Sequence, residues 1–256
     1  MTFWDHLDEL RGVLFRSALV ILLFAIVIFF NKAFIFNNIV FAPANSGFIL
    51  YRWFESLAKL TGMNSVSLSS FNIELINIDL SAQFFTHVSL SLTLGLILAA
   101  PYVLYQLWRF VKPGLYDKER TAIKKAFGFA SLLFFIGVLV GYLFVFPLTL
   151  RFLGTYQVSE QVVNQISLKS YMSMFTWMIL IMGVVFEMPA LIAILSGMGI
   201  ISRTLLKKYR KYAFTILLIV AAIITPSGDA FTLFVVAIPL YLLYELSILV
   251  SRDINK

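Results

Sequence analysis

Long apolar stretches alternate with shorter polar intervals along almost the whole chain. A helix that crosses the hydrocarbon core of a bilayer needs about 20 predominantly apolar residues. Six stretches reach or approach this length, at about 13–30, 82–108, 126–149, 170–200, 212–225 and 231–250. We therefore predict an all-α, polytopic membrane protein whose six transmembrane helices form a single membrane domain over residues 1–256.

Two of these stretches differ from a straight span of ordinary length. Pro189 interrupts the fourth, and a proline removes a backbone donor and bends or breaks a helix. The fifth is so short that it needs a thinner bilayer around it or an interfacial flank, which Tyr209 and Tyr212 provide. The pattern predicts a kinked fourth helix and a short fifth helix.

The longest polar interval, 31–81, follows the first stretch and contains an amphipathic segment at 46–61. In helical projection its polar and apolar side chains fall on opposite faces, with Arg52, Glu55, Ser56 and Lys59 on one and Leu50, Trp53, Phe54, Leu57 and Leu60 on the other. We predict an amphipathic helix that lies on the membrane surface or covers the end of the bundle. Between the last two stretches, Pro226-Ser227-Gly228-Asp229 predicts a tight turn.

Composition agrees with a membrane protein and excludes several kinds of chemistry. Hydrophobic residues make up 61% of the chain and charged residues 13%, which leaves too little polar surface for a fold surrounded by water. The absence of cysteine excludes disulfides, thiolate metal sites and thiol nucleophiles. His6 and His87 have no metal-binding spacing and no phosphate-binding glycine loop occurs, so we expect no metal, no cofactor and no enzymatic activity.

The basic residues predict how the helices are oriented. Of the 20 Lys and Arg residues, fifteen lie in one alternating set of segments and five in the other. The larger set is Arg11, Arg16, Arg109, Lys112, Lys118, Arg120, Lys124, Lys125, Arg203, Lys207, Lys208, Arg210, Lys211, Arg252 and Lys256, and the smaller is Lys32, Arg52, Lys59, Arg151 and Lys169. Cytoplasmic loops carry such an excess, so we predict that both termini are cytoplasmic. Topology therefore explains the basic loops, and we expect no nucleic-acid partner.

The first apolar stretch lacks a small-residue cleavage site of the kind found in signal peptides, so we interpret it as a retained helix.

Two carboxylates occupy segments that are otherwise basic. Glu9 directly precedes the first apolar stretch, where it can offset the dipole of a helix N-terminus while Asp8 pairs with Arg11. Glu119 follows Asp117, a candidate N-cap, and would lie in the first turn of the third helix. Both positions therefore have a structural explanation as well as a functional one.

Two further carboxylates lie within the apolar stretches. Glu187 is deep in the fourth stretch, where an ionisable group is costly and is a functional candidate by default. It needs a partner or water, or else carries its proton and bonds to a neighbouring helix. Glu245 lies near the end of the sixth stretch and can reach the interface or pair with Arg252.

The motifs around these residues occur in a fixed order. They are His6-Leu7-Asp8-Glu9-Leu10-Arg11, Ala42-Pro43, Ala100-Pro101, Tyr105-Gln106-Leu107-Trp108-Arg109-Phe110, Pro113-Gly114-Leu115-Tyr116-Asp117-Lys118-Glu119-Arg120, Phe146-Pro147-Leu148, Phe186-Glu187-Met188-Pro189, Thr225-Pro226, Ala237-Ile238-Pro239 and Tyr244-Glu245. Their order over nearly the whole chain resembles the TatC family, the multispanning subunit of the twin-arginine protein translocase. The chain departs from the family pattern at Val13, where a second arginine is common, and in a turn before Asp229 that is one residue longer.

The resemblance implies a receptor for secretory signal peptides that carry two adjacent arginines. Glu9 and Glu119 would be the receptor carboxylates, because a guanidinium group binds carboxylates through paired hydrogen bonds that lysine cannot copy. Phe110 and Leu115 would form the apolar surface beside them. Arg11 and Arg120 belong to the same motifs and are assigned to the same site.

The resemblance also implies partners and a location. Glu187 and Pro189 would form a polar site inside the membrane that faces single-span TatA- and TatB-like subunits or the inserted signal peptide. Pro43, Asp229 and Glu245 are further candidates. The family exports folded proteins independently of Sec, uses the proton gradient and resides as a homo- or hetero-oligomer among the lipids of the bacterial plasma (inner) membrane.

Two other functions fit parts of the pattern. A proton-coupled secondary transporter of a small solute could use Glu187 as its mid-membrane site, but the internal inverted repeats typical of such proteins are not evident. An intramembrane protease could use His87, but no serine elbow of the GxSxG type accompanies it.

Overall fold

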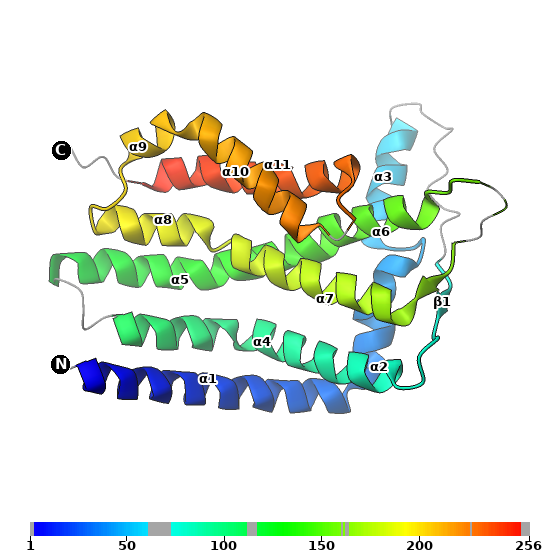
Figure 1. Cartoon of the computed structure of the whole chain (residues 1–256), viewed down its shortest axis with the longest axis horizontal. Coiled ribbons are helices and arrows are strands. Elements are labelled where there is room, and N and C mark those ends of the chain that lie inside the picture. The colour runs from blue at the N-terminus through cyan, green and yellow to red at the C-terminus, as the bar shows by residue number, and fades with distance from the viewer. Residues whose placement is uncertain are drawn as a thin grey trace.

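The computed structural model describes residues 3–60, 73–111, 117–159, 161, 164–225 and 227–251, without the side chains of residues 3, 5, 57 and 117–126. The axes of most of its long helices are roughly aligned, and these helices form a bundle (Figure 1). They are α1 (Phe3–Phe30), α4 (Ala82–Val111), α5 (Asp117–Val140), α6 (Phe146–Thr155), α7 (Leu168–Val185), α8 (Met188–Gly197), α10 (Arg210–Ile224) and α11 (Ala230–Val250). We call the end where α1 begins and α11 ends the terminal end, and the opposite end the cap end (Figure 1).

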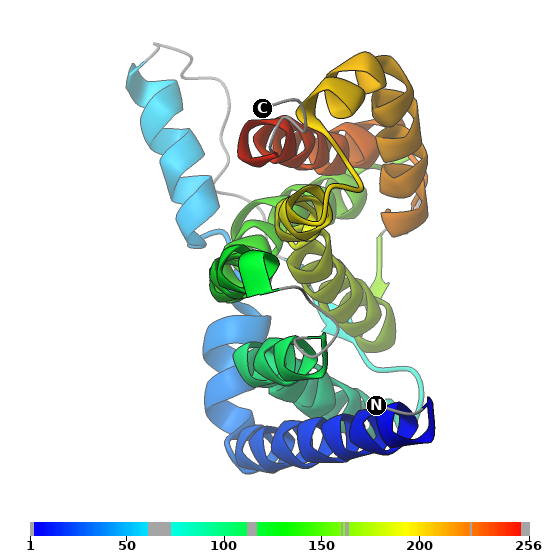
Figure 2. The same ribbon diagram turned by 90° about the vertical axis from the view of Figure 1, so that its left-hand side faces the viewer.

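Helices α1 and α4 form an antiparallel pair along one side of the bundle (Figures 1 and 2). A Cβ atom at Gly95 would lie 2.8 Å from both the backbone nitrogen of Ala25 and the carbonyl oxygen of Ile21. The two backbones therefore touch at this level, as small residues allow in membrane helices. Near the cap end the rings of His87 and Phe29 stack at 4.0 Å.

The predicted third span is one continuous helical run that contains a π-helical turn. Helix α5 leads through Gly141–Val145, which is π-helical, into α6. It packs closely on α7, because a Cβ atom at Gly137 would lie 2.5 Å from the carbonyl oxygen of Met182. Such contact leaves no room for a side chain at this position.

The predicted fourth span consists of two helices. Helix α7 ends at Val185 and α8 begins at Met188, with Phe186 and Glu187 in the turn between them. Pro189 is the second residue of α8, where its missing N–H is no loss. The interruption therefore precedes the proline by two residues.

Helix α10, the predicted fifth span, has 15 residues and is about 22 Å long, well short of the roughly 30 Å hydrocarbon core. The indole nitrogen of Trp177 on α7 donates to the carbonyl oxygen of Ile224 and so holds the last residue of α10. At the terminal end, Arg203 in the short helix α9 (Arg203–Lys208) donates to the carbonyl oxygens of Ile248 and Leu249. Polar contacts thus hold α10 and its connection on the bundle.

The cap end holds a chain segment that runs across the bundle (Figure 1). It comprises α2 (Lys32–Ile35), the π-helix η1 (Phe36–Val40), the 3-10 helix η2 (Ala42–Ala44) and α3 (Ile49–Leu60). Two tyrosines of the bundle anchor η1: Tyr142 donates to the Ile39 carbonyl at 2.9 Å and Tyr171 to the Val40 carbonyl at 2.6 Å. Strands β1 (Leu75–Ile76) and β2 (Ile166–Ser167) pair in parallel and join two loops at this end.

Among the described residues, six helical stretches have the length and hydropathy to cross a membrane. Five of them contain predicted spans, but the sixth is Lys32–Leu60 in place of the short α10. Figure 1 shows why length alone misleads here, because 32–60 is bent and lies across the other helices. That α10 is one of the six crossings therefore stays a prediction from the sequence.

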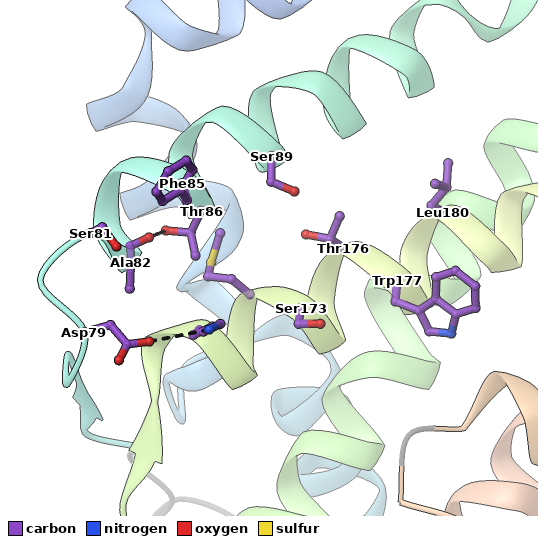
Figure 3. Close-up of a pocket in the computed structure, with 12 residues that line it drawn as sticks. Asp79, Ser81, Ala82, Phe85, Thr86, Ser89, Ser173, Thr176, Trp177 and Leu180 are labelled. Atoms are coloured by element: carbon purple, nitrogen blue, oxygen red, sulfur yellow. Dashed lines mark hydrogen bonds and ion pairs between the residues drawn. The ribbon is translucent and has the colours of Figure 1, made fainter.

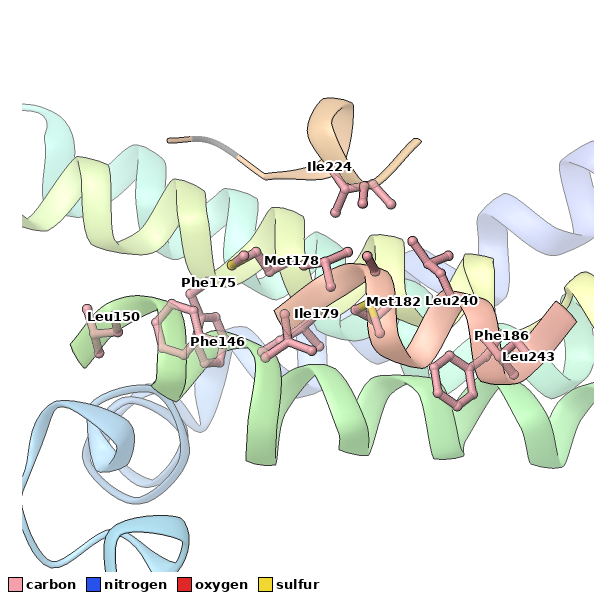
Figure 4. Close-up of a cluster of buried hydrophobic side chains, with 14 of the residues drawn as sticks. Phe146, Leu150, Phe175, Met178, Ile179, Met182, Phe186, Ile224, Leu240 and Leu243 are labelled. Carbon is pink, nitrogen blue, oxygen red and sulfur yellow. The ribbon is translucent and has the colours of Figure 1, made fainter. Parts of the chain in front are cut away.

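The apolar core lies where α5, α6, α7 and α11 meet (Figure 4). Phe146, Phe175, Met178, Met182 and Leu240 are almost completely buried there. The Phe146 and Phe175 rings meet edge to face at 5.1 Å. Helix α7 contributes Phe175, Met178 and Met182 to this core, so the turn at Phe186 and Glu187 directly follows a closely packed helix.

Candidate functional site

The terminal end brings α1, α4 and the beginning of α5 together (Figure 1). The ring of His6 on α1 stacks on Phe110 near the end of α4, with centroids 4.2 Å apart and ring planes 23° apart. Glu9 lies three residues after His6 and so on the same face of α1. The structure thus brings two predicted site residues, Glu9 and Phe110, to the same seam.

Glu9 is half-buried, and its Oε2 atom is buried without a hydrogen-bond partner in the part of the chain that the structure describes. No ion pair joins Asp8 to Arg11 among the described side chains, and Arg11 is exposed. Buried polar atoms are nearly always hydrogen-bonded in proteins, so an unpaired carboxylate oxygen is an exception that calls for a donor. A cationic ligand can supply that donor.

Gln106 on α4 is a further candidate that the sequence prediction did not single out. It is 3% exposed, its Nε2 donates to the Tyr102 hydroxyl at 2.6 Å, and its Oε1 has no partner within the described ranges. Gln106 lies three helical turns after Gly95, so it faces α1 as Gly95 does. The antiparallel register that pairs His6 with Phe110 places it near the level of Glu9.

The sequence contained a weak signal for His6 and Gln106, the two residues of this seam that were not among the predicted site residues. His6 precedes Glu9 by three residues, and Gln106 precedes Phe110 by four, so each lies one helical turn from a predicted site residue. Both belong to the motifs that carry the family resemblance. Spacing alone, however, does not show which helix their faces meet.

The remaining predicted residues of this end are placed by backbone only. Helix α5 begins at Asp117, the candidate N-cap, and the backbone of Glu119 falls in its first turn, as predicted; Arg120 follows it. Their side chains and the whole of Leu115 lie outside the described part of the structure. The first turn of α5 carries Glu119 at the same end of the bundle as Glu9 (Figure 1).

Glu187 lies in the turn between α7 and α8. Its backbone N–H donates to the Val184 carbonyl and its carbonyl accepts from Leu191, but its side chain caps neither helix. The Oε1 atom is buried and has no hydrogen-bond partner within the described residues. The helix break therefore presents a carboxyl group with one buried oxygen atom that is unpaired among the described residues.

A groove of about 480 Å³ lies between α4 and α7 toward the cap end. Figure 3 shows Ser89 on α4 and Thr176 on α7 pointing toward one another across it. An ion pair between Asp79 and Lys169, 3.5 Å apart, lies at its mouth. Leu180 at the inner end of the groove precedes Glu187 by two helical turns.

Asp229 caps the start of α11. Its Oδ1 accepts from the Thr232 backbone N–H at 2.8 Å, and its Oδ2 accepts from the hydroxyls of Thr232 and Ser227. Burial raises the pKa of Asp229, but these hydrogen bonds outweigh it and hold the pKa below the usual range of a carboxyl group. Its described contacts are those of a structural cap.

The other two candidates also make structural contacts. Glu245 accepts from Arg210 at 2.8 Å, which links α11 to α10; its predicted partner Arg252 lies outside the described residues. Pro43 is buried in η2, and its carbonyl accepts from the Tyr51 hydroxyl at 3.1 Å. No group of three or more His, Asp or Glu side chains in the described ranges is placed to hold a metal ion.

Comparison with known proteins connects this geometry to one family. The family model described as "Sec-independent protein translocase protein (TatC)" matches residues 5–239. The chain belongs to the TatC family. Glu9, Phe110, Glu119 and Glu187 all lie within the matched residues, whereas Glu245 lies beyond them.

Individual TatC proteins match along nearly the full length. The "Sec-independent protein translocase protein TatC" of Blattabacterium sp. subsp. Periplaneta americana (strain BPLAN) is 40% identical over 258 residues, covering 100% of this chain and 97% of that protein. The "Sec-independent protein translocase protein TatCy" of Bacillus subtilis (strain 168) is 31% identical over 252 residues, covering 98% and 89%. These names are those of translocase proteins rather than enzymes.

Two solved structures share the fold. One, "Crystal Structure of Twin Arginine Translocase Receptor- TatC", superposes with a TM-score of 0.67 at 32% identity and covers 96% of this chain and 97% of that one. The other, the same receptor in DDM, gives a TM-score of 0.70 at 32% identity and covers 96% and 99%. The polytopic helical architecture described above is therefore that of TatC.

Proposed function

We propose that this protein is the receptor for twin-arginine signal peptides and the multispanning core of a Sec-independent translocase. The unpaired, buried Oε2 of Glu9 beside the His6–Phe110 stack carries the proposal. The protein's likeness to two crystal structures, each described as a twin-arginine translocase receptor, supports it. Family membership supports the translocase role.

The chemistry of the arginine pair suits this end of the bundle. A guanidinium group offers five N–H donors in a planar fork, whereas an ammonium group is a compact point charge. Glu9 would take one guanidinium group and Glu119 the other, while the apolar residues that flank the arginines pack on Phe110 and Leu115. The lysines that surround these carboxylates in the sequence would repel weakly bound cationic segments, so that only a peptide that engages both carboxylates stays bound.

Peptide binding to the purified protein tests this proposal. We expect a twin-arginine signal peptide to bind more tightly than its twin-lysine counterpart. Glu9→Ala and Glu119→Ala should each weaken it by about 10- to 100-fold, because hydrogen bonds to charged groups contribute about 1.5–3 kcal/mol. Glu74→Ala, an exposed carboxylate on the loop before α4, is the matched control. Equal affinity for the two peptides, or wild-type affinity in the double variant, would contradict the receptor assignment.

Glu187 and Pro189 would form a second site, for the single-span TatA- and TatB-like subunits or the inserted part of the signal peptide. The unused Oε1 of Glu187 and the break in the helix support this role, because a polar side chain of a neighbouring helix can bond to it. A photo-crosslinker at Leu191, an exposed residue one turn after Glu187, should join a single-span subunit. A crosslinker that captures only lipid would speak against the site.

The proposal includes a location. The terminal end, which carries Glu9 and most of the Lys and Arg residues, would face the cytoplasm of a bacterium, and the cap end would face the other side of the plasma membrane. Signal peptides would then reach Glu9 before export begins. The proton gradient would drive export, as the family resemblance implies.

A further inference from the structure

Helix α3 leaves the bundle at the cap end and remains largely uncovered. In both views it runs across the long helices rather than along them (Figures 1 and 2). Its first turn packs on the bundle, where Leu50 and Tyr51 are buried. Farther along, Trp53 is 58% exposed and Leu60 is 82% exposed. A helix with such large uncovered apolar side chains needs another surface to cover them.

The side chains of α3 divide into a polar and an apolar arc. The polar arc is Arg52, Glu55, Ser56 and Lys59, and the uncovered apolar arc is Ile49, Trp53, Phe54 and Leu60. Glu55 and Lys59 form an ion pair at 2.9 Å, so Arg52 is left as the unbalanced charge of the polar arc. A net positive polar arc beside an aromatic and aliphatic arc is the composition of helices that bind membrane surfaces.

The bundle fixes how these arcs are oriented. The Tyr51 hydroxyl lies 3.1 Å from the carbonyl oxygens of both Pro43 and Pro147, which tie α3 to η2 and to α6. The guanidinium group of Arg151 lies over the Tyr51 ring, 5.7 Å from its centroid. These contacts prevent α3 from rotating about its axis, so its apolar arc keeps one direction relative to the long helices.

We infer that α3 is an interfacial helix that inserts its apolar arc into the lipid leaflet at the cap end. The long helices of the bundle cross the bilayer, so a helix that runs across them lies in the membrane plane. Trp53 would occupy the boundary between head groups and acyl chains, where tryptophan is enriched. Arg52 would reach the lipid phosphates. The occupant is a phospholipid surface, and the inference does not depend on signal-peptide binding.

Tryptophan quenching in lipid vesicles tests this position. The chain has four tryptophans, and replacing Trp4, Trp108 and Trp177 by Phe leaves Trp53 as the only one. The variant is reconstituted alone into phosphatidylcholine vesicles whose acyl chains carry bromine either near the head group or near the chain end. We expect bromine near the head group to remove more Trp53 fluorescence than bromine near the chain end, and aqueous iodide to remove little.

A tryptophan on the polar arc, well away from position 53, is the matched control. Lys59→Trp combined with Trp53→Phe in the same background places the probe on the exposed polar arc, about 120° around the axis of the same helix from position 53. This probe should respond to iodide and little to brominated lipid. Iodide quenching at both positions would overturn the inference, because α3 would then stand in water. Stronger quenching of Trp53 by bromine at the chain end, or no quenching of it by either agent, would overturn it as well.

Discussion

Glu9 on α1 and Gln106 on α4 each carry a buried oxygen atom that has no hydrogen-bond donor among the described side chains. Each such atom lowers the stability of the free protein by on the order of 1–3 kcal/mol, because it has left water without gaining a partner. A ligand that supplies donors removes this deficit. The proposed binding site therefore lowers the free energy of unfolding of the ligand-free protein, which is common for functional sites.

The Asp229 cap predicts a pH-dependent stability. Asp229→Asn keeps an acceptor for the Thr232 N–H but removes the charge. Because the pKa of Asp229 is lower in the folded than in the unfolded protein, the charge stabilises the fold above the unfolded pKa, and this contribution is lost as the pH falls through the folded pKa. The variant should therefore unfold at a lower temperature at neutral pH, and the difference should shrink as the pH falls through the folded pKa of Asp229. Thermal unfolding in detergent measures it, and a difference that grows in acid would contradict the prediction.

At the scale of residues, resemblance to the family identified Glu9 and Phe110, and the structure brings them to one seam. His6 and Gln106 were missed although each lies one helical turn from a predicted residue. The sequence shows which residues share a face of one helix. It does not show which faces of two distant helices meet, since that depends on how the whole bundle packs.

At the scale of elements, proline chemistry accounts for the break in the fourth span. Pro189 has no N–H for the carbonyl of Val185, and its ring would clash with that carbonyl in a continuous helix. Helix α7 accordingly ends at Val185, and the proline becomes the second residue of α8. The sequence predicted an interruption. Its position at Phe186 and Glu187 follows because the proline ring excludes a helical carbonyl group four residues earlier, at Val185.

Two glycines of α5 give a matched test of its packing. Gly137→Ala should destabilise the protein by about 1–3 kcal/mol, because the new Cβ would lie 2.5 Å from the Met182 carbonyl oxygen. At Gly128 a Cβ meets nothing within 4 Å, so Gly128→Ala should leave stability unchanged or raise it by up to about 1 kcal/mol. Unfolding of both variants in detergent measures the contrast. Equal effects would mean that α5 and α7 are not in backbone contact.

At the scale of the whole molecule, the first residue of α1 and the last residue of α11 lie at one end of the bundle (Figure 1). We expect this end to be cytoplasmic, and the absence of cysteine makes the test direct. In intact cells a membrane-impermeant maleimide should label Gln157→Cys, exposed in the loop after α6, but not Lys207→Cys, exposed in α9. Labelling at position 207 and not at 157 would reverse the orientation.

The sequence by itself determined that the chain crosses a membrane, and it placed the apolar stretches close to the helices observed. Hydropathy succeeds because a membrane segment must satisfy its own backbone hydrogen bonds, so each span is a local property. Only the tertiary structure decided that 32–60 lies across the bundle while the shorter α10 joins it, and that Phe110 near the end of α4 meets His6 on α1. These facts depend on contacts between residues far apart in the chain, such as Tyr171 with Val40 and Gly95 with Ala25, which no local pattern contains.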